Sequence, residues 1–237
     1  MSRFNAIWQS VLLGAFGGLL VHYYSVGDLV FFIYPKYNEL VLASAWLLIL
    51  LAIYQLFAAT ETSENEEPTY KDLLSCAALT LILILALVLP PKALSSATAL
   101  ARGLSTDLVL VNGQMQTFGL KPEDRTLLDW IKLFNYNPEP QAYVGQKVAL
   151  EGFIVQDPSL PESTFMITRF AMACCAADAR PIALPVHFDP QKFTPLQDDW
   201  VYLEGRMAET SLNAKRRAWI ELDLLESRPV PLDPYAY

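Results

Sequence analysis

The feature that most constrains this chain is a set of three long segments without a charged side chain. They contain 24, 21 and 19 residues, and hydrophobic residues make up 53% of the whole sequence. A helix rises ~1.5 Å per residue and the bilayer core is ~30 Å thick, so roughly 20 apolar residues cross it. We therefore expect a membrane protein with three spanning helices, at about residues 4–25, 40–60 and 73–90.

The first apolar segment has an alternative interpretation as a cleaved signal peptide, which has a shorter apolar stretch and a small-residue cleavage site. Its apolar part is long here and ends in the aromatic pair Tyr23–Tyr24, as is typical of a helix that ends at a membrane interface. We favour a spanning helix. The lipid bilayer is then the first expected partner.

The net charge of −8 bears on the remaining partners. The chain up to Asp72 has three basic and seven acidic residues, and the rest has 14 basic and 18 acidic residues. Neither part has the basic excess that drives nucleic-acid binding, so nucleic acid is excluded as a partner.

The sequence predicts three regions. Residues 1–91 form the transmembrane region, residues 92–120 a juxtamembrane connector, and residues 121–237 a mainly-β domain with one leading helix. Pro122 suits the first turn of that helix, and the pair Asn137–Pro138 ends it.

Alternation with period two predicts five short strands from Gly145 onward. Buried faces are expected to include Val148, Leu150 and Ile154 in the first strand, and Ile220, Leu222 and Leu224 in the last. Two of the strands have a glycine at the end of a Leu-Glu-Gly tripeptide, where a sheet can bend sharply. Five strands with such glycines indicate a small barrel of the OB type, with a five-stranded sandwich as the alternative.

Several phrases carry a family resemblance over nearly the whole length. They are GDLVFFIYPKY after the first span, LSSATALARGLS after the last, ITRFAMACCAADARPIALPV, DWVYLEG and the ending RPVPLDPYAY. With these phrases the chain resembles the YcgQ-like family of permease subunits, whose C-terminal part is a domain of unknown function. Tyr34 stands where that family usually has histidine before the first-loop proline, so no ligand role is transferred to this position.

The resemblance implies a membrane subunit that accompanies a larger multi-span permease, in some cases in a zinc-responsive context. It also favours an extracytoplasmic C-terminal domain in a multi-pass protein of the cell membrane. The basic residues near the spans do not decide this orientation. With three spans, one side of the membrane has two of them, Arg3 and Lys71, and the other side has three, Lys36, Lys92 and Arg102.

Two of the three cysteines, Cys174 and Cys175, are adjacent at the end of a predicted strand. Successive side chains of a regular strand point to opposite faces, so the two sulfurs can bind one ion only if the chain bends. Asp178 and His187 are candidate companions, because thiolate, imidazole and carboxylate together form an acceptable zinc set. These four residues are the candidate metal site, and zinc is the only cofactor that the sequence suggests.

Two other interpretations of the paired cysteines stay open. A vicinal disulfide is disfavoured by geometry, because adjacent Cα atoms lie ~3.8 Å apart and disulfides usually join Cα atoms 4.4–6.8 Å apart. Alternatively the cysteines are small hydrophobic residues that fill the barrel end, with Asp178 shaping the turn and pairing with Arg169 or Arg180. We favour this packing interpretation.

The first span also contains Gly14 and Gly18, whose spacing allows close helix packing in a membrane. No nucleophile elbow, phosphate loop or pair of catalytic carboxylates is recognisable, so we expect no catalysis. The first functional hypothesis is an accessory subunit of a permease, whose OB-like domain binds a partner or a substrate ion. The alternatives are a zinc-handling or metal-sensing protein that uses the Cys174–Cys175 region, and a thiol oxidoreductase.

Overall fold

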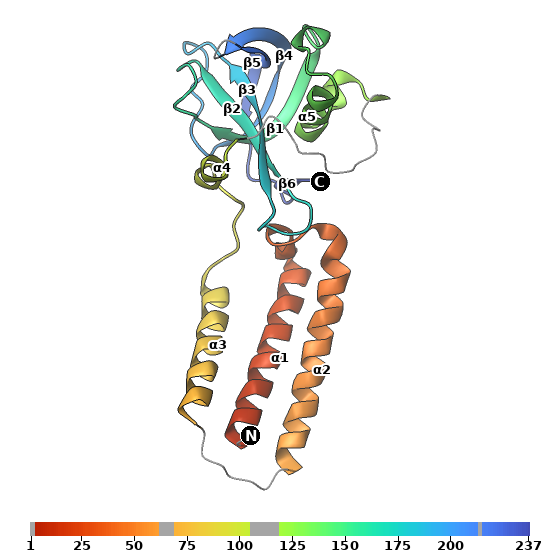
Figure 1. Ribbon diagram of the computed structural model, residues 1–237, viewed down its shortest axis with the longest axis vertical. Coiled ribbons are helices and arrows are strands. Elements are labelled where there is room, and N and C mark those ends of the chain that lie inside the picture. The colour runs from red at the N-terminus through yellow and green to blue at the C-terminus, as the bar shows by residue number, and fades with distance from the viewer. Residues whose placement is uncertain (1–2, 62–68, 105–118, 213–214) are drawn as a thin grey trace. The chain divides into compact units, whose positions relative to one another are not determined.

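The computed structural model describes residues 3–61, 69–104, 119–212 and 215–237 (Figure 1). The chain divides into two compact units, Met1–Lys92 and Ala93–Tyr237. The first unit is helical and consists of α1 (Arg3–Val26), η1 (Asp28–Phe31), η2 (Pro35–Tyr37), α2 (Asn38–Glu61) and α3 (Tyr70–Val88). The second unit is mainly β.

Helices α1 and α2 form a hairpin that packs along its length, and α3 packs less extensively against α1 (Figure 1). Of the three glycines in α1, Gly17 lies nearest to α2. A Cβ atom built there would lie 2.7 Å from a side-chain carbon of Ile49 and 2.9 Å from the carbonyl oxygen of Ala45. The absence of a side chain at Gly17 therefore lets the two backbones approach, as small residues do in membrane helices.

The glycine pair singled out from the sequence is placed differently. A Cβ atom at Gly14 would make an ordinary 3.6 Å contact with Ala52, whereas one at Gly18 would meet no atom within 4 Å. Within the described helices Gly14 thus faces α2 loosely and Gly18 faces away from it. The tight helix contact belongs to Gly17, one residue before Gly18.

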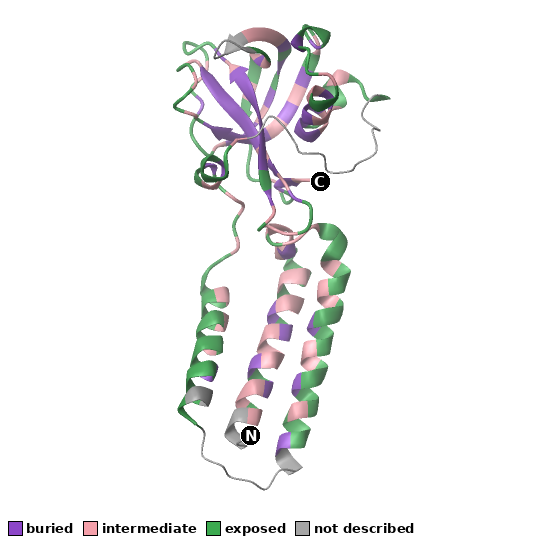
Figure 2. Cartoon of the chain, viewed as in Figure 1, coloured by how far each residue is buried: buried purple, intermediate pink, exposed green. Residues whose placement is uncertain are grey.

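Two helical segments, Ala6–Val26 and Pro35–Ala59, are long and apolar enough to cross a membrane. The apolar part of α3, Leu73–Val88, is shorter. Figure 2 shows that the three helices bury only narrow stripes of their surfaces, and large apolar side chains such as Leu40, Leu50 and Leu87 stay exposed.

Six strands form the sheet of the second unit: β1 (Lys147–Val155), β2 (Thr164–Ala171), β3 (Arg180–His187), β4 (Trp200–Leu212), β5 (Lys215–Ser227) and β6 (Tyr235–Ala236). The order is β1-β4-β5-β3-β2-β6, and β1 also pairs with β2. The first five strands therefore close into a barrel, as the alternation in the sequence predicts. The short β6 adds to the edge at the end of β2.

The two predicted bending glycines both lie close to the backbone of a paired strand. A Cβ atom at Gly152 would lie 2.6 Å from the carbonyl oxygen of Thr168, and one at Gly205 would lie 2.2 Å from that of Glu221. The register between β4 and β5 shifts at Glu204/Gly205. Any side chain at Gly205 would force the two strands apart, which explains the glycine.

The same irregularity corrects one expected face. Glu204 pairs with Leu224 and Gly205 pairs with Leu222, so Asp223 is the extra residue of a bulge. A bulge shifts the alternation by one position. Ile220 is buried as expected, but Leu224 is exposed, and Leu225 packs against the core instead. In the first strand the expected buried face is confirmed.

The leading helix covers the core. Pro122–Asp124 forms a separate 3-10 turn (η4), and the α-helix α5 spans Leu127–Tyr136, so it begins five residues later than Pro122. The side chain of Thr126 accepts a hydrogen bond from the backbone N–H of Asp129, and the Asp129 carboxylate accepts one from the backbone N–H of Thr126. This capping box fixes the start of α5.

Part of the expected connector, residues 92–120, belongs to the β unit. Residues 96–102 form the short helix α4 (Ser96–Arg102), which packs against β1 and β3. Its first backbone N–H, that of Ser96, donates a 2.7 Å hydrogen bond to Oδ1 of Asp198. Residues 105–118 of the connector lie outside the described residues.

Candidate functional site: a cysteine loop at the end of two strands

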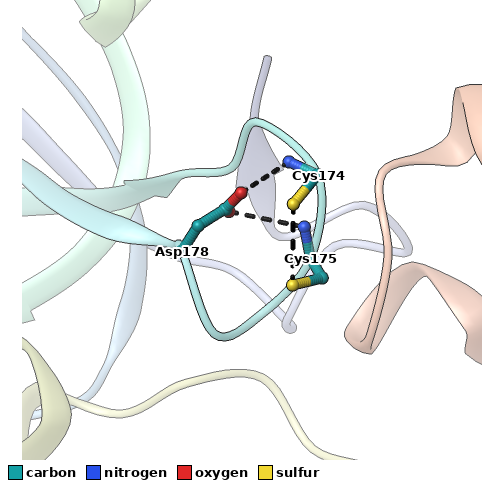
Figure 3. Close-up of side chains that lie close together, drawn as sticks. All are labelled: Cys174, Cys175 and Asp178. Carbon is teal, nitrogen blue, oxygen red and sulfur yellow. Dashed lines mark hydrogen bonds between the residues drawn. The ribbon is translucent and has the colours of Figure 1, made fainter.

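The paired cysteines lie in the connection between β2 and β3, in a turn that covers residues 173–178 (Figure 3). Before this turn, the backbone N–H of Met172 donates to the carbonyl oxygen of Ala236, next to the pairing of β2 with β6. The chain then leaves the strand geometry, so the bend that the sequence requires for a shared ligand is present. We call residues 173–179 the cysteine loop.

Asp178 organises the cysteine loop. One carboxylate oxygen accepts the backbone N–H of Cys174 at 2.8 Å, and the other accepts the N–H groups of Ala173 at 3.3 Å and Cys175 at 3.4 Å. A single side chain thus satisfies three consecutive backbone donors, of which Figure 3 shows those of Cys174 and Cys175. The expectation that Asp178 shapes the turn is confirmed.

The two sulfur atoms point to the same side of the loop and lie 3.7 Å apart (Figure 3). Both sulfurs and a carboxylate oxygen of Asp178 lie within 4.8 Å of one another. Cys174 is exposed, and Cys175 and Asp178 are half-buried. The packing interpretation is therefore wrong for Cys174, whose side chain fills no part of the barrel interior.

The two arginines that the sequence offered as partners of Asp178 lie elsewhere. The guanidinium of Arg169 donates to the backbone carbonyl oxygens of Asp233 and Pro234. Among the ion pairs of the described residues, none joins Asp178 to Arg169 or Arg180. The negative charge of Asp178 is instead stabilised by backbone N–H groups.

The electrostatics of the loop follow from this arrangement. The pKa of the Cys174 thiol is raised to about 12. The largest cause is the hydrogen bond of this thiol with the Asp178 carboxylate, and the second is its hydrogen bond with the Cys175 sulfur. Desolvation acts to raise the pKa of Asp178, but hydrogen bonds from the Cys174 thiol and from three backbone N–H groups outweigh it and lower that pKa. At neutral pH the loop therefore holds a carboxylate beside a protonated thiol.

Arg102 holds the loop from the other side. Its guanidinium donates to the backbone carbonyl oxygen of Ala176 at 3.1 Å and also to that of Ala179. Arg102 is the last residue of α4, whose first residue is held by Asp198. The cysteine loop is thus fixed by Asp178 from within and by α4 from outside.

His187, the fourth residue of the expected metal site, is not part of this cluster. It ends β3, whereas the cysteine loop precedes the first residue of β3. Seven steps of ~3.3 Å place the two ends of this strand roughly 23 Å apart. The ring of His187 stacks on Trp219 with ring centroids 4.5 Å apart.

Sequence reasoning did not find the role of Arg102. Its position in the last turn before Gly103 was visible as a helix C-terminus signal, but 74 residues separate it from Ala176. Local patterns contain no information about that contact. The pairing of the C-terminal residues with β2 was missed for the same reason.

Two thiols and a carboxylate suit a thiophilic cation, because thiolates are soft ligands and a bound cation removes their protons. They suit an oxidoreductase poorly, because a reactive cysteine needs a lowered pKa and Cys174 has a raised one.

No curated protein and no solved structure matches the chain. Residues 8–105 match the model of the DUF1980 N-terminal domain, and residues 113–237 match the model of the DUF1980 C-terminal domain. The second match includes the whole cysteine loop. Because the two matches together take in nearly all of the sequence, the chain belongs to the DUF1980 family.

Proposed function

We propose that this protein is a non-enzymatic accessory subunit of a larger permease, anchored in the cell membrane by its helices. The apolar outer surface of the helical unit carries this proposal. Leu40, Leu50 and Leu87 are 65%, 62% and 66% exposed, respectively. Each Å² of such surface costs roughly 25 cal/mol in water, and that cost disappears in lipid.

We infer that α3 is a third span. It contains 19 residues, which corresponds to about 28 Å of helix and is close to the ~30 Å of the bilayer core. Of the two hydroxyl-bearing residues within the apolar stretch, Ser75 and Thr80, the hydroxyl of Thr80 donates to the carbonyl oxygen of Cys76. Such bonding within the helix is what a polar group in lipid requires.

The partner is inferred from what the helices lack. Their three apolar segments contain no Asp, Glu, Lys or Arg, and their single histidine, His22, lies near the end of the first segment. Ion and proton pathways through membranes are usually marked by ionisable residues inside the spans. We therefore infer that these helices supply an anchor and a docking surface, and the resemblance to permease subunits supports a larger multi-span protein as the partner.

We further infer that the barrel is of the OB type and that it lies outside the cytoplasm. The strand pairing supports the OB type: β1 pairs with both β2 and β4, and β3 runs parallel to β5. OB-type barrels present one face and its loops to ligands. Protease accessibility of the β unit in intact cells, compared with lysed cells, tests the orientation.

The accessory role is tested by affinity capture of the full-length protein in mild detergent after cross-linking in the membrane. We expect a multi-span protein at constant stoichiometry, and the same result for a variant with both Cys174→Ser and Cys175→Ser. An unrelated three-helix protein with the same tag is the control. Recovery of the chain alone, as a monomer at full yield, would refute the accessory role.

A second candidate function, handling of a metal ion by the β unit, is favoured by one specific observation. Three potential ligand atoms, from Cys174, Cys175 and Asp178, converge within 4.8 Å. Metal analysis of the purified full-length protein tests this function. We expect bound metal in the parent protein and none after both cysteines are changed to serine, and an unchanged metal content would remove this candidate.

A further inference from the structure

The spacing of the two sulfurs identifies the class of cation that fits the cysteine loop. Two thiolates bound tetrahedrally at ~2.3 Å lie about 3.8 Å apart, whereas a linear arrangement at the same bond length would place them roughly 4.6 Å apart. The observed separation of Cys174 Sγ and Cys175 Sγ is 3.7 Å. This separation fits two corners of a tetrahedral site and is too short for linear coordination.

Asp178 supplies a third corner that is already oriented. Its carboxylate is held by the backbone N–H groups of Ala173, Cys174 and Cys175. Such outer hydrogen bonds fix the direction of a coordinating carboxylate, and their loss typically weakens metal binding by about 10- to 100-fold. The three potential ligand atoms lie within 4.8 Å of one another in the loop as it stands.

Arg102 stabilises the same geometry. By holding the carbonyl oxygens of Ala176 and Ala179, it keeps the second half of the loop in place. Two thiolates and one carboxylate carry three negative charges. A divalent cation offsets more of this charge than a monovalent one does, which favours a divalent cation.

The fourth corner has no ligand from the described residues. The cluster of potential ligands there comprises Cys174, Cys175 and Asp178, and His187 lies at the far end of β3. Structural zinc sites are closed by four protein ligands, whereas sites that exchange a ligand have three and leave one position open. The exposure of Cys174 leaves the open corner accessible from solvent.

We propose that the cysteine loop is a transfer site for a thiophilic divalent cation of the zinc and cadmium class, completed by a fourth ligand from the donor or acceptor. This inference rests on the metal-handling function proposed above. On binding, the cation replaces the thiol protons of Cys174 and Cys175, which pass to solvent, and no electrons are transferred. Exchange then proceeds by substitution at the fourth corner.

The test uses full-length protein in detergent micelles, reduced with a phosphine so that no other thiol is present, and Cd²⁺ as the probe. Cadmium–thiolate absorption in the ultraviolet counts the sulfurs on each bound ion. We expect one tightly bound Cd²⁺ with two thiolates. A small added thiol should then raise the absorption per bound ion by about half, because a third sulfur enters the open corner.

Variants assign the signal to the loop. Cys174→Ser and Cys175→Ser should each abolish tight binding, and Arg102→Gln should weaken it about tenfold without changing the number of thiolates. Cys76→Ser is the matched control, because Cys76 is buried in α3. This change should alter neither the affinity for Cd²⁺ nor the number of thiolates on each bound ion.

The outcomes separate the two claims. Tight two-thiolate binding without a rise on addition of thiol would overturn the transfer site and leave the metal-handling function standing. The transfer site would also be overturned if the added thiol removed cadmium from the protein and the absorption per bound ion did not rise. Absence of tight Cd²⁺ binding would overturn the metal-handling function together with this inference, whereas the accessory role depends on the capture experiment alone.

Discussion

Arg102 donates a hydrogen bond to the backbone carbonyl oxygen of Ala176, and so ties the last residue of α4 to a loop 74 residues further along the chain. The same guanidinium holds Ala179. The cysteine loop therefore depends on a helix that sequence alone assigns to a connector. Contacts of this kind can be tested one at a time.

Arg102→Gln should loosen the cysteine loop while leaving the barrel intact. We expect faster hydrogen exchange of the amides of residues 173–178, because two loop carbonyls lose a charged donor, with a melting temperature lower by only about 2–4 °C. Arg180→Gln is the matched control, since Arg180 is exposed beside the same loop. Equal exchange in the two variants would refute the role of Arg102.

The reactivity of Cys174 should depend on Asp178. The pKa of this thiol is raised to about 12, and the hydrogen bond with Asp178 is the largest cause. Alkylation at pH 8 should therefore be slower than that of an ordinary cysteine. The rate should rise with pH as the thiol ionises. Asp178→Asn should speed the reaction about tenfold for each unit by which the pKa falls, because the thiolate fraction grows accordingly.

This experiment is best done on the metal-free protein with Cys76→Ser and Cys175→Ser, so that one thiol remains. Asparagine keeps an oxygen that accepts backbone N–H groups but removes the charge. If the single-thiol protein that keeps Asp178 reacted at pH 8 as fast as a free cysteine, the electrostatic account would be contradicted.

Gly17→Ala should destabilise the pairing of α1 with α2. Its new Cβ would lie 2.9 Å from the carbonyl oxygen of Ala45, a backbone atom that cannot move aside cheaply. We expect a loss of about 1–3 kcal/mol, as is typical of overpacking. Gly18→Ala is the control, because its Cβ would meet no atom within 4 Å. Thermal unfolding is measured in detergent. An equal loss of stability in the two variants would contradict the placement of Gly17.

Gly205→Ala should destabilise the barrel far more than a methyl group added at an open position. The added carbon would lie 2.2 Å from the carbonyl oxygen of Glu221, within the β4–β5 pairing. We expect a loss of about 2 kcal/mol or more in the free energy of unfolding, compared with under about 0.5 kcal/mol for Gly119→Ala, whose Cβ meets no atom within 4 Å. Unchanged stability of the Gly205 variant in denaturant unfolding would refute the bulge geometry.

Alternation in the sequence was enough to predict five strands that form a barrel, and the buried side chains of Val148, Leu150 and Ile154 confirm one of its faces. The prediction of buried faces from alternation failed at the end of β5, where Leu224 is exposed and Leu225 packs inward. The cause is the bulge at Asp223, which arises from the pairing with β4. A single strand's own pattern carries no information about its partner's register.

The candidate site was predictable only in part. Adjacent cysteines followed by an aspartate predicted the cluster of potential ligand atoms, because the three residues are close in sequence and one turn brings them together. His187 was added by composition, as a typical zinc ligand, and the length of β3 carries it away from the loop. Arg102 was missed because its contact is made across the fold.

Anchoring of the chain in the bilayer, on which the accessory role depends, is tested by lysing cells, extracting the membranes at alkaline pH and locating the full-length protein after ultracentrifugation. If apolar helices hold the chain in lipid, it stays in the pellet at high pH and enters the supernatant only after detergent is added. Recovery of the intact protein in the supernatant without detergent would contradict the account.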